Sequence, residues 1–281
     1  MQSLSKNVMV MVTGDFDNIR SPQIRFLQEA SHLGDLHVFL WSDALIRSIR
    51  GISPKFSEAE RSYFLESNRF VKHVSLIHKL DDVTGLPHFD SKSPVPLTWV
   101  VNGEQAREEQ KTFCTRNGYG YQVLTVEALS GFPLDELDSL PEKGKQKRVV
   151  VTGCFDWMHS GHVRFFEEAS AFGELFVVVG HDENLRLLKG EGHPLFPEDE
   201  RRYLVQSVRF VTRALISSGS GWMDAEPEID RIKPDYYVVN EDGDKPEKRE
   251  FCVQHNIEYK VLKRLPKPGL PRRESTTLRG F

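Results

Sequence analysis

Residues 152–178 read TGCFDWMHSGHVRFFEEASAFGELFVV and contain the pattern that decides the fold. An apolar, β-branched run precedes them, and a short loop with Gly153 leads into a segment whose apolar side chains recur at Val163, Phe166 and Ala169. That spacing is typical of one helix face, and the apolar run after it is typical of a buried strand. A strand, a helix and a second buried strand in this order predict a βαβ unit with parallel strands.

The same pattern occurs earlier in the chain. Residues 13–39 read TGDFDNIRSPQIRFLQEASHLGDLHVF, and 13 of these 27 positions are identical to residues 152–178 without a gap. The match resumes between residues 56–71 and residues 196–211, and shorter matches follow at a similar offset. An ordered series of this kind indicates a tandem duplication of one domain.

Strands alternate with helices in both copies, so we predict an α/β fold with two tandem Rossmann-like domains, each built on a doubly wound parallel sheet. A length of 281 residues suits two domains. The expected first domain covers residues 1–138, a polar linker covers 139–147, and the second domain covers 148–281. Further expectations are strands at 8–12, 149–152, 175–180 and 236–240, a helix at 198–207, and a helix C-cap at Gly173.

Composition narrows the class of protein. The net charge is −4, which argues against a dedicated nucleic-acid binder, since such proteins present a strongly basic face. None of the three cysteines is in CxxC spacing, so neither a zinc knuckle nor a redox pair is predicted, and a reducing, cytoplasmic setting is expected. No apolar run approaches the roughly 18 residues that span a bilayer.

The junction that follows the first strand of the second copy contains the main candidate catalytic residues. His159 and His162 are three residues apart at the start of the predicted helix, so they share one face. A helix N-terminus offers free N–H groups and partial positive charge, which suit phosphate, and Gly161 leaves space for a triphosphate. The alternatives are a capping histidine or a metal site, but no third ligand stands at an obvious spacing, so no protein metal ligand is predicted.

The second copy resembles the cytidylyltransferase-like nucleotidyltransferases that have an HxGH motif, through GCFD at residues 153–156 and HSGH at 159–162. These include glycerol-3-phosphate and phosphoethanolamine cytidylyltransferases and adenylyltransferases that act on heptose phosphate. Lys189-Gly190, Glu200-Arg201 and the STT at residues 275–277 also match the family pattern. The duplication resembles the tandem-domain ethanolamine-phosphate cytidylyltransferases.

The resemblance implies catalytic roles for His159, His162 and Lys189. Together with the phosphate argument, it suggests a larger set of nucleotide-binding candidates, namely Thr152, Gly153, Cys154, Phe155, Asp156, Gly161, Arg201, Asn240, Asp242, Arg272, Arg273, Ser275, Thr276 and Thr277.

Some of these candidates have a second interpretation. Lys189 can be a solvated lysine, and Arg201 can belong to a structural ion pair, because the first copy also has Glu60-Arg61. Asp242 can contact the base, the second substrate or Mg²⁺. The basic tail has less spacing between arginine and serine than the family pattern, so the choice between Arg272 and Arg273 stays open.

The first copy lacks both histidines. Arg20, Pro22 and Gln23 stand where the second copy has His159, Gly161 and His162, while Arg50-Gly51 retains the Lys189-Gly190 position. We therefore predict that the first domain is inactive and packs on the second as an intramolecular pseudo-dimer partner. A homodimer of the whole chain is an alternative.

The predicted reaction is transfer of CMP from CTP to a phosphorylated alcohol or sugar, with Mg²⁺ and with release of pyrophosphate. ATP-dependent adenylyl transfer to a sugar phosphate is the alternative, and a nucleotide-binding regulatory module is the non-enzymatic one. An NAD(P)-dependent oxidoreductase lacks support, because neither first βα turn contains GxGxxG. No nucleic-acid partner and no membrane span are expected.

Overall fold

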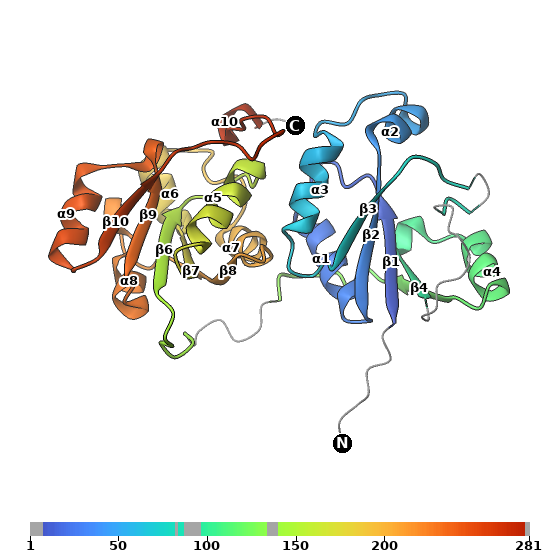
Figure 1. Cartoon of the computed structure of the whole chain (residues 1–281), viewed down its shortest axis with the longest axis horizontal. Helices are drawn as coiled ribbons and strands as arrows, with labels where there is room; N and C mark the ends of the chain where they lie inside the picture. Colours follow the sequence, from blue (N-terminus) through green and yellow to red (C-terminus); the bar gives the residue numbers. More distant parts are fainter. Residues whose placement is uncertain (1–7, 82–83, 87–96, 134–139, 279–281) are drawn as a thin grey trace, which may run out of the picture. The chain divides into compact units, whose positions relative to one another are not determined.

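The computed structural model describes residues 8–81, 84–86, 97–133 and 140–278, without the side chains of Thr276 and Thr277. Two compact units divide the chain, Met1–Gly131 and Phe132–Phe281. Each unit contains a five-stranded sheet whose paired strands are all parallel (Figure 1). The predicted fold class, two Rossmann-like α/β domains, is confirmed.

The first sheet has the strand order β3-β2-β1-β4-β5. Its elements in chain order are β1 (Met9–Gly14), α1 (Ser21–Ser31), β2 (Asp35–Trp41), α2 (Asp43–Arg50), α3 (Glu58–Glu66), β3 (His73–Ile77), β4 (Leu97–Asn102), α4 (Glu108–Arg116) and β5 (Gly120–Leu124).

The second sheet has the order β10-β9-β6-β7-β8, which is the same topology. Its elements are β6 (Arg148–Gly153), α5 (Ser160–Ser170), β7 (Glu174–Val179), α6 (Asp182–Lys189), α7 (Glu198–Gln206), β8 (Val211–Ile216), the 3-10 turn η2 (Gly221–Met223), α8 (Glu226–Ile232), β9 (Tyr236–Asn240), α9 (Pro246–Gln254), β10 (Glu258–Leu262) and α10 (Ser275–Leu278).

The central strands are apolar on both faces because helices cover both faces. In β7, all side chains from Leu175 to Val179 are buried, and in α5 the stripe Val163, Phe166 and Ala169 is fully buried. One face of the sheet packs on α8 and α9 through a cluster that includes Phe176. Connections β6–β7 and β7–β8 run one way along the sheet and β8–β9 and β9–β10 run the other, so right-handed crossovers place α5 and α7 on the opposite face.

This topology positions the site. Chain direction along the sheet reverses beside β6, between β6 and β9. Ligands of open α/β sheets bind at the carboxyl ends of the strands at such a switch point.

Two local expectations were wrong. Lys189 was expected on no helix, but it is the last residue of the helix α6. Gly173 was expected to be the helix C-cap, whereas Ala171 caps α5. Gly173 is needed for another reason, because a Cβ there would lie 2.1 Å from the Lys147 carbonyl oxygen.

The described end of the expected linker, residues 140–147, contacts the second unit. Leu140 packs against the α8 and α9 cluster. Lys147 forms an ion pair of 3.0 Å with Asp235, and Lys143 donates to the Lys233 carbonyl.

Candidate functional site

A pocket of about 640 Å³ lies at the carboxyl end of β6 and β9, within the volume range of small-molecule sites. It collects residues from the β6–α5 loop, the end of α6, the segment after β9 and the segment after β10. Its lining includes the predicted residues Thr152, Gly153, Cys154, Phe155, Asp156, His159, Gly161, His162, Lys189, Asn240, Asp242 and Ser275.

His159 is the N-cap of α5 and is almost fully buried. Its Nδ1 accepts a hydrogen bond of 3.1 Å from the Gly161 N–H, so the neutral ring has its proton on Nε2. That Nε2 is buried and has no hydrogen-bond partner among the described residues. Burial lowers the pKa of His159, and the neighbouring His162, Arg264 and Arg273 lower it further. His159 is therefore a neutral donor at neutral pH.

His162 stacks on His159 with a distance of 4.0 Å between the ring centroids and 24° between the planes. The edge of Phe155 meets its other side at 5.4 Å. Burial lowers the pKa of His162, and the positive charges of Arg264 and Lys189 add to the effect. The two imidazoles thus form one neutral, ordered pair that faces the pocket.

The glycines of this junction make room for aromatic rings. A Cβ at Gly153 would lie 2.8 Å from Phe155 Cζ, and a Cβ at Gly161 would lie 2.9 Å from His159 Cε1. Phe155 holds a left-handed φ of 51°, which a bulky residue rarely adopts. Gly161 was expected to leave space for a triphosphate, and the structure shows that aromatic ring packing also disfavours a side chain at both glycines.

Two of the predicted nucleotide contacts support the loop. Asp156 Oδ1 accepts from the Leu195 and Phe196 N–H groups at 2.7 and 3.1 Å. Arg201 has no exposed surface and does not line the pocket. Its guanidinium donates to the Cys154 carbonyl and to Asp182 Oδ1, each at 2.7 Å, and to the Phe196 carbonyl at 2.9 Å. Of the two interpretations of Arg201, the geometry favours the structural one.

The first copy makes the same supporting contacts. Asp17 accepts from the Lys55 and Phe56 N–H groups at 2.8 and 2.9 Å. Arg61 donates to the Asp15 carbonyl at 2.5 Å and to Asp43 at 2.6 Å. Because both copies keep these contacts, GxFD and ER serve the loop conformation whether or not the histidines are present.

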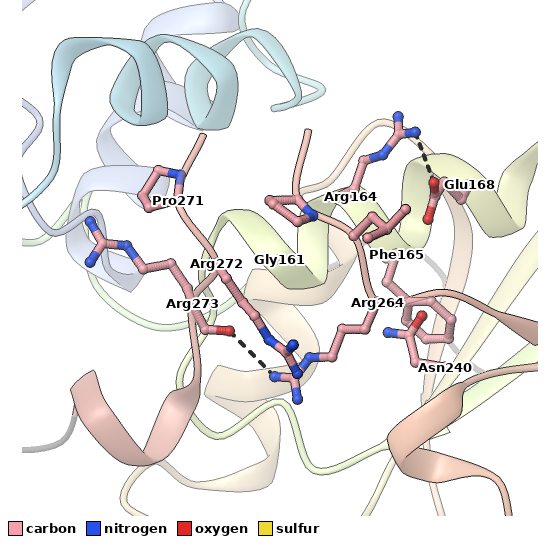
Figure 2. Close-up of a pocket in the computed structure, with 11 residues that line it drawn as sticks. Gly161, Arg164, Phe165, Glu168, Asn240, Arg264, Pro271, Arg272 and Arg273 are labelled. Atoms are coloured by element: carbon pink, nitrogen blue, oxygen red, sulfur yellow. Dashed lines mark hydrogen bonds and ion pairs between the residues drawn. The ribbon is translucent and has the colours of Figure 1, made fainter. Parts of the chain in front are cut away.

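Arg264 is the main residue that sequence reasoning missed. It follows β10, forms an ion pair of 2.6 Å with Asp242, and donates to the Arg273 carbonyl at 3.3 Å. Figure 2 shows Arg264, Arg272 and Arg273 around Gly161, and they line a smaller pocket that adjoins the main one. A basic residue just after a strand in a parallel sheet was the available signal, since strand ends converge on the site.

The two arginines of the basic tail, Arg272 and Arg273, have different surroundings. Arg273 lies close enough to His159 to lower its pKa, whereas the Arg272 side chain is 58% exposed and lies 3.7 Å from Glu274. Ser275 Oγ donates to the Trp157 carbonyl at 3.4 Å. The side chains of Thr276 and Thr277 lie outside the described part of the structure.

The corresponding junction of the first unit differs in its charged residues and in its first helical turn. Arg50, the counterpart of Lys189, forms an ion pair with Asp15, the counterpart of Cys154. Pro22 stands at the position of Gly161 in the first turn of α1. The cation that would meet a phosphate is neutralised by a carboxylate of the same unit.

The described residues include no group of three or more His, Cys, Asp or Glu side chains that could hold a metal ion. Among the described helices, none is long and apolar enough to cross a membrane.

Comparisons with known proteins agree with this geometry. A family model described as cytidylyltransferase-like matches residues 150–260. FAD synthase from Aciduliprofundum boonei is 38% identical over 125 residues, which cover 43% of this chain and 80% of that protein. The bifunctional protein HldE from Campylobacter concisus is 35% identical over 111 residues, 39% of this chain and 23% of that protein.

Among solved structures, the lipopolysaccharide core biosynthesis protein from Thermoplasma volcanium GSS1 is 27% identical, with a TM-score of 0.36. The match covers 46% of this chain and 99% of that chain.

A parallel α/β sheet with a pocket of small-molecule size and a histidine pair at its switch point is typical of an enzyme that handles nucleotides. The chain belongs to the cytidylyltransferase-like family, and it is a nucleotidyltransferase.

Proposed function

We propose that the second unit transfers a nucleoside monophosphate from a nucleoside triphosphate to the phosphate of a small acceptor and releases pyrophosphate. The observation that supports this best is the neutral His159–His162 pair, whose buried Nε2 donor on His159 lacks a partner among the described residues. A phosphate oxygen is the acceptor that such a donor at a helix N-terminus fits.

Catalysis by this site is positioning and charge stabilisation, as in phosphoryl transfer generally. The acceptor phosphate attacks the α-phosphorus, the bond to the bridging oxygen breaks, and pyrophosphate leaves with the electron pair. His159 and His162 donate to the oxygens on which charge builds. Lys189 and Arg273 hold the departing pyrophosphate, while Arg264 stays paired with Asp242 and orders the wall.

The choice of nucleotide rests on the relatives and on Asn240. FAD contains an adenylate, so relatives named FAD synthase favour ATP over the CTP that the motifs suggested. Asn240 Oδ1 is buried without a partner among the described residues and lines both pockets. It can accept from the exocyclic amino group that adenine and cytosine share, whereas uracil has none.

Magnesium is expected to enter with the triphosphate, where it neutralises phosphate charge. The pocket fits that arrangement, because Asp242 and Glu274 line it but no three-ligand cluster exists among the described residues. Magnesium usually combines one or two carboxylates with substrate phosphates.

We also propose that the first unit is catalytically inactive. It lacks the histidines, and the Arg50–Asp15 ion pair occupies the position of the lysine that faces the pocket in the second unit.

The test of the reaction measures pyrophosphate release by the full chain with each of the four triphosphates, Mg²⁺ and phosphorylated acceptors. We expect turnover with ATP or CTP. His162→Ala should lower kcat by a factor on the order of 100 to 1,000, comparable to loss of one preorganised donor. Wild-type turnover in that variant would contradict the proposed role of the pair.

A further inference from the structure

Cys154 is the cysteine that lines the main pocket. It is half-buried and contributes to the pocket wall. Cys114 and Cys252 are buried, and burial raises the pKa of each of these thiols to about 11. Reactive cysteines lie in partly exposed, electropositive surroundings, whereas buried ones are inert. Of the three thiols in the chain, Cys154 is therefore the one that a small oxidant can reach.

The backbone fixes the direction of the Cys154 side chain, and it does so in the same way in both copies. Arg201 donates to the Cys154 carbonyl at 2.7 Å. In the first copy, Arg61 donates to the Asp15 carbonyl at 2.5 Å. The phenylalanine that follows each of these two residues has a left-handed φ, of 51° and 46°. Cys154 and Asp15 therefore occupy equivalent positions in equivalent loops.

A cation lies at an equivalent position in each copy as well. Lys189 ends α6 and Arg50 ends α2, and each of these helices has eight residues. The first N–H of each helix donates to a glutamate, at 2.7 and 2.8 Å. The glycine after each helix donates at 2.9 Å to the carbonyl four residues before it. Because Arg50 forms an ion pair with Asp15, the same supports direct Cys154 toward Lys189, and both line one pocket.

This pocket contains polar groups that suit an added oxygen anion. Among the described residues, Lys189 forms no ion pair. His159 is 3% exposed, and its Nε2 has no partner in the described part of the chain. A cation without a paired anion and a buried donor without an acceptor both gain from an oxygen atom bound to the Cys154 sulfur.

Oxidation gives a cysteine the shape and charge of an aspartate. A sulfinate has two oxygens and one negative charge on its sulfur, as a carboxylate has on its carbon. The first unit therefore shows what an oxygen anion does at this position. The carboxylate of Asp15 pairs with Arg50, the cation that would otherwise meet a phosphate.

We propose that Cys154 is an oxidation site for hydrogen peroxide, and that its sulfinate pairs with Lys189 and closes the pocket to the triphosphate. This inference rests on the proposed function and adds a regulation of the same site. The thiolate attacks one peroxide oxygen, the O–O bond breaks, and hydroxide leaves with the electron pair. That hydroxide takes the proton of the transferred oxygen and becomes water. The resulting sulfenate reacts with a second peroxide in the same way and becomes the sulfinate.

Mass spectrometry and nucleotide binding by the full chain test the inference without turnover. Hydrogen peroxide should add two oxygens to Cys154 and none to Cys114 or Cys252. Bound ATP or CTP with Mg²⁺ should slow the oxidation of Cys154, because the nucleotide covers it. After removal of the peroxide, the calorimetric affinity for the nucleotide should be weaker by about tenfold or more, since like charges oppose each other at close range.

Matched variants separate the effect of charge from general damage. Cys154→Ser should have the same nucleotide affinity before and after peroxide treatment, each sample being compared with its own untreated control. Cys154→Asp should bind nucleotide about tenfold or more weakly than Cys154→Asn, which has a similar shape without the charge. The fold accommodates this aspartate, because the first unit has one at the equivalent position.

Several results would overturn the inference. They are an unoxidised Cys154 after treatment of the nucleotide-free protein, an unchanged nucleotide affinity of the oxidised protein, an equal loss of affinity in treated Cys154→Ser, and equal affinities of Cys154→Asp and Cys154→Asn. Failure of the proposed function is a different result, namely nucleotide binding by the untreated wild type without pyrophosphate release with any acceptor.

Discussion

His159 combines three roles in one residue. It caps α5 by accepting from the Gly161 N–H, it stacks on His162, and it points a buried Nε2 donor without a described partner at the pocket. The cap fixes the tautomer, and the stack fixes the ring plane. Gly161 makes this arrangement feasible because any side chain there would meet the His159 ring.

The first prediction concerns Gly161→Ala. The added Cβ would lie 2.9 and 3.0 Å from two atoms of the His159 ring, so the ring must move. Misplacement of a reacting group by about 1 Å can cost on the order of 100-fold in rate. We expect kcat to fall by roughly 10- to 100-fold with little change in melting temperature. Gly144→Ala, which meets no atom within 4 Å, is the control and should keep full kcat.

The second prediction concerns pH. The pKa of each histidine in the pair is lower in the folded protein than in the unfolded chain, where it is about 6.5. Above pH 6.5 both states are neutral and nothing is gained or lost. Below pH 6.5 the unfolded chain binds protons that the folded protein does not. The free energy of unfolding therefore decreases as the pH is lowered.

Urea denaturation at pH 7.5 and 5.5 measures this loss. The wild type should lose about 2 to 3 kcal/mol more than His159→Gln/His162→Gln over that interval, because each of the two histidines contributes about 1.4 kcal/mol between these pH values. The exposed His78→Gln variant should behave as the wild type. Equal losses in the wild type and the double variant would show that the pair titrates normally.

At the scale of elements, the β6–α5 loop is stabilised by hydrogen bonds from a later helix of the same unit. Arg201 of α7 reaches the Cys154 carbonyl and the first turn of α6 through Asp182, and Arg61 of α3 makes the equivalent contacts in the first unit. Removal of a fully buried guanidinium leaves its hydrogen-bond partners unsatisfied, which typically lowers the free energy of unfolding by about 3 kcal/mol or more.

The third prediction uses this equivalence. Arg201→Met and Arg61→Met should each destabilise their own unit by about 3 kcal/mol in urea denaturation. Only Arg201→Met should lower kcat for pyrophosphate release under native conditions, because only that loop leads to the histidines. Parallel loss of kcat in Arg61→Met would contradict the assignment of chemistry to the second unit.

The sequence predicted the elements whose burial is regular. The stripe of α5 and the continuous apolar run of β7 are visible in the letters, and both lie where expected. The helix α6 was not predicted, because Leu185 is buried while Leu187 and Leu188 are exposed, so its apolar residues do not mark a single face.

The site was predictable where motif and strand end coincide, and less so elsewhere. His159 and His162 are three residues apart in the sequence, and their rings stack in the structure. Arg264 lies near them only because parallel strands bring distant loops to one edge of the sheet. The role of Arg201 needed its hydrogen-bond partners, since a charged helical run gives no indication of which arginine is buried.

At the scale of the whole molecule, the two units share one topology, and the histidine pair is present in one of them. The strand order is the same in both units. The proposed phosphate ligands His159, His162 and Lys189 are present only in the second unit. In the first unit, Arg50 replaces Lys189 and is neutralised by Asp15.

The fourth prediction is one nucleotide per chain. Calorimetric titration of the full chain with ATP or CTP and Mg²⁺ should give a stoichiometry near one. His159→Ala/His162→Ala should retain no measurable pyrophosphate release. Two sites per chain, or residual turnover in the double variant, would assign a working site to the first unit.

The Arg50–Asp15 ion pair also bears on any attempt to engineer a second site into this chain. Arg20→His, Pro22→Gly and Gln23→His together would introduce the motif into the first unit, yet Asp15 would still neutralise the nearby cation and repel a phosphate. Asp15→Cys would be needed as well, so a transplanted site takes four simultaneous substitutions, of which the motif itself supplies only three.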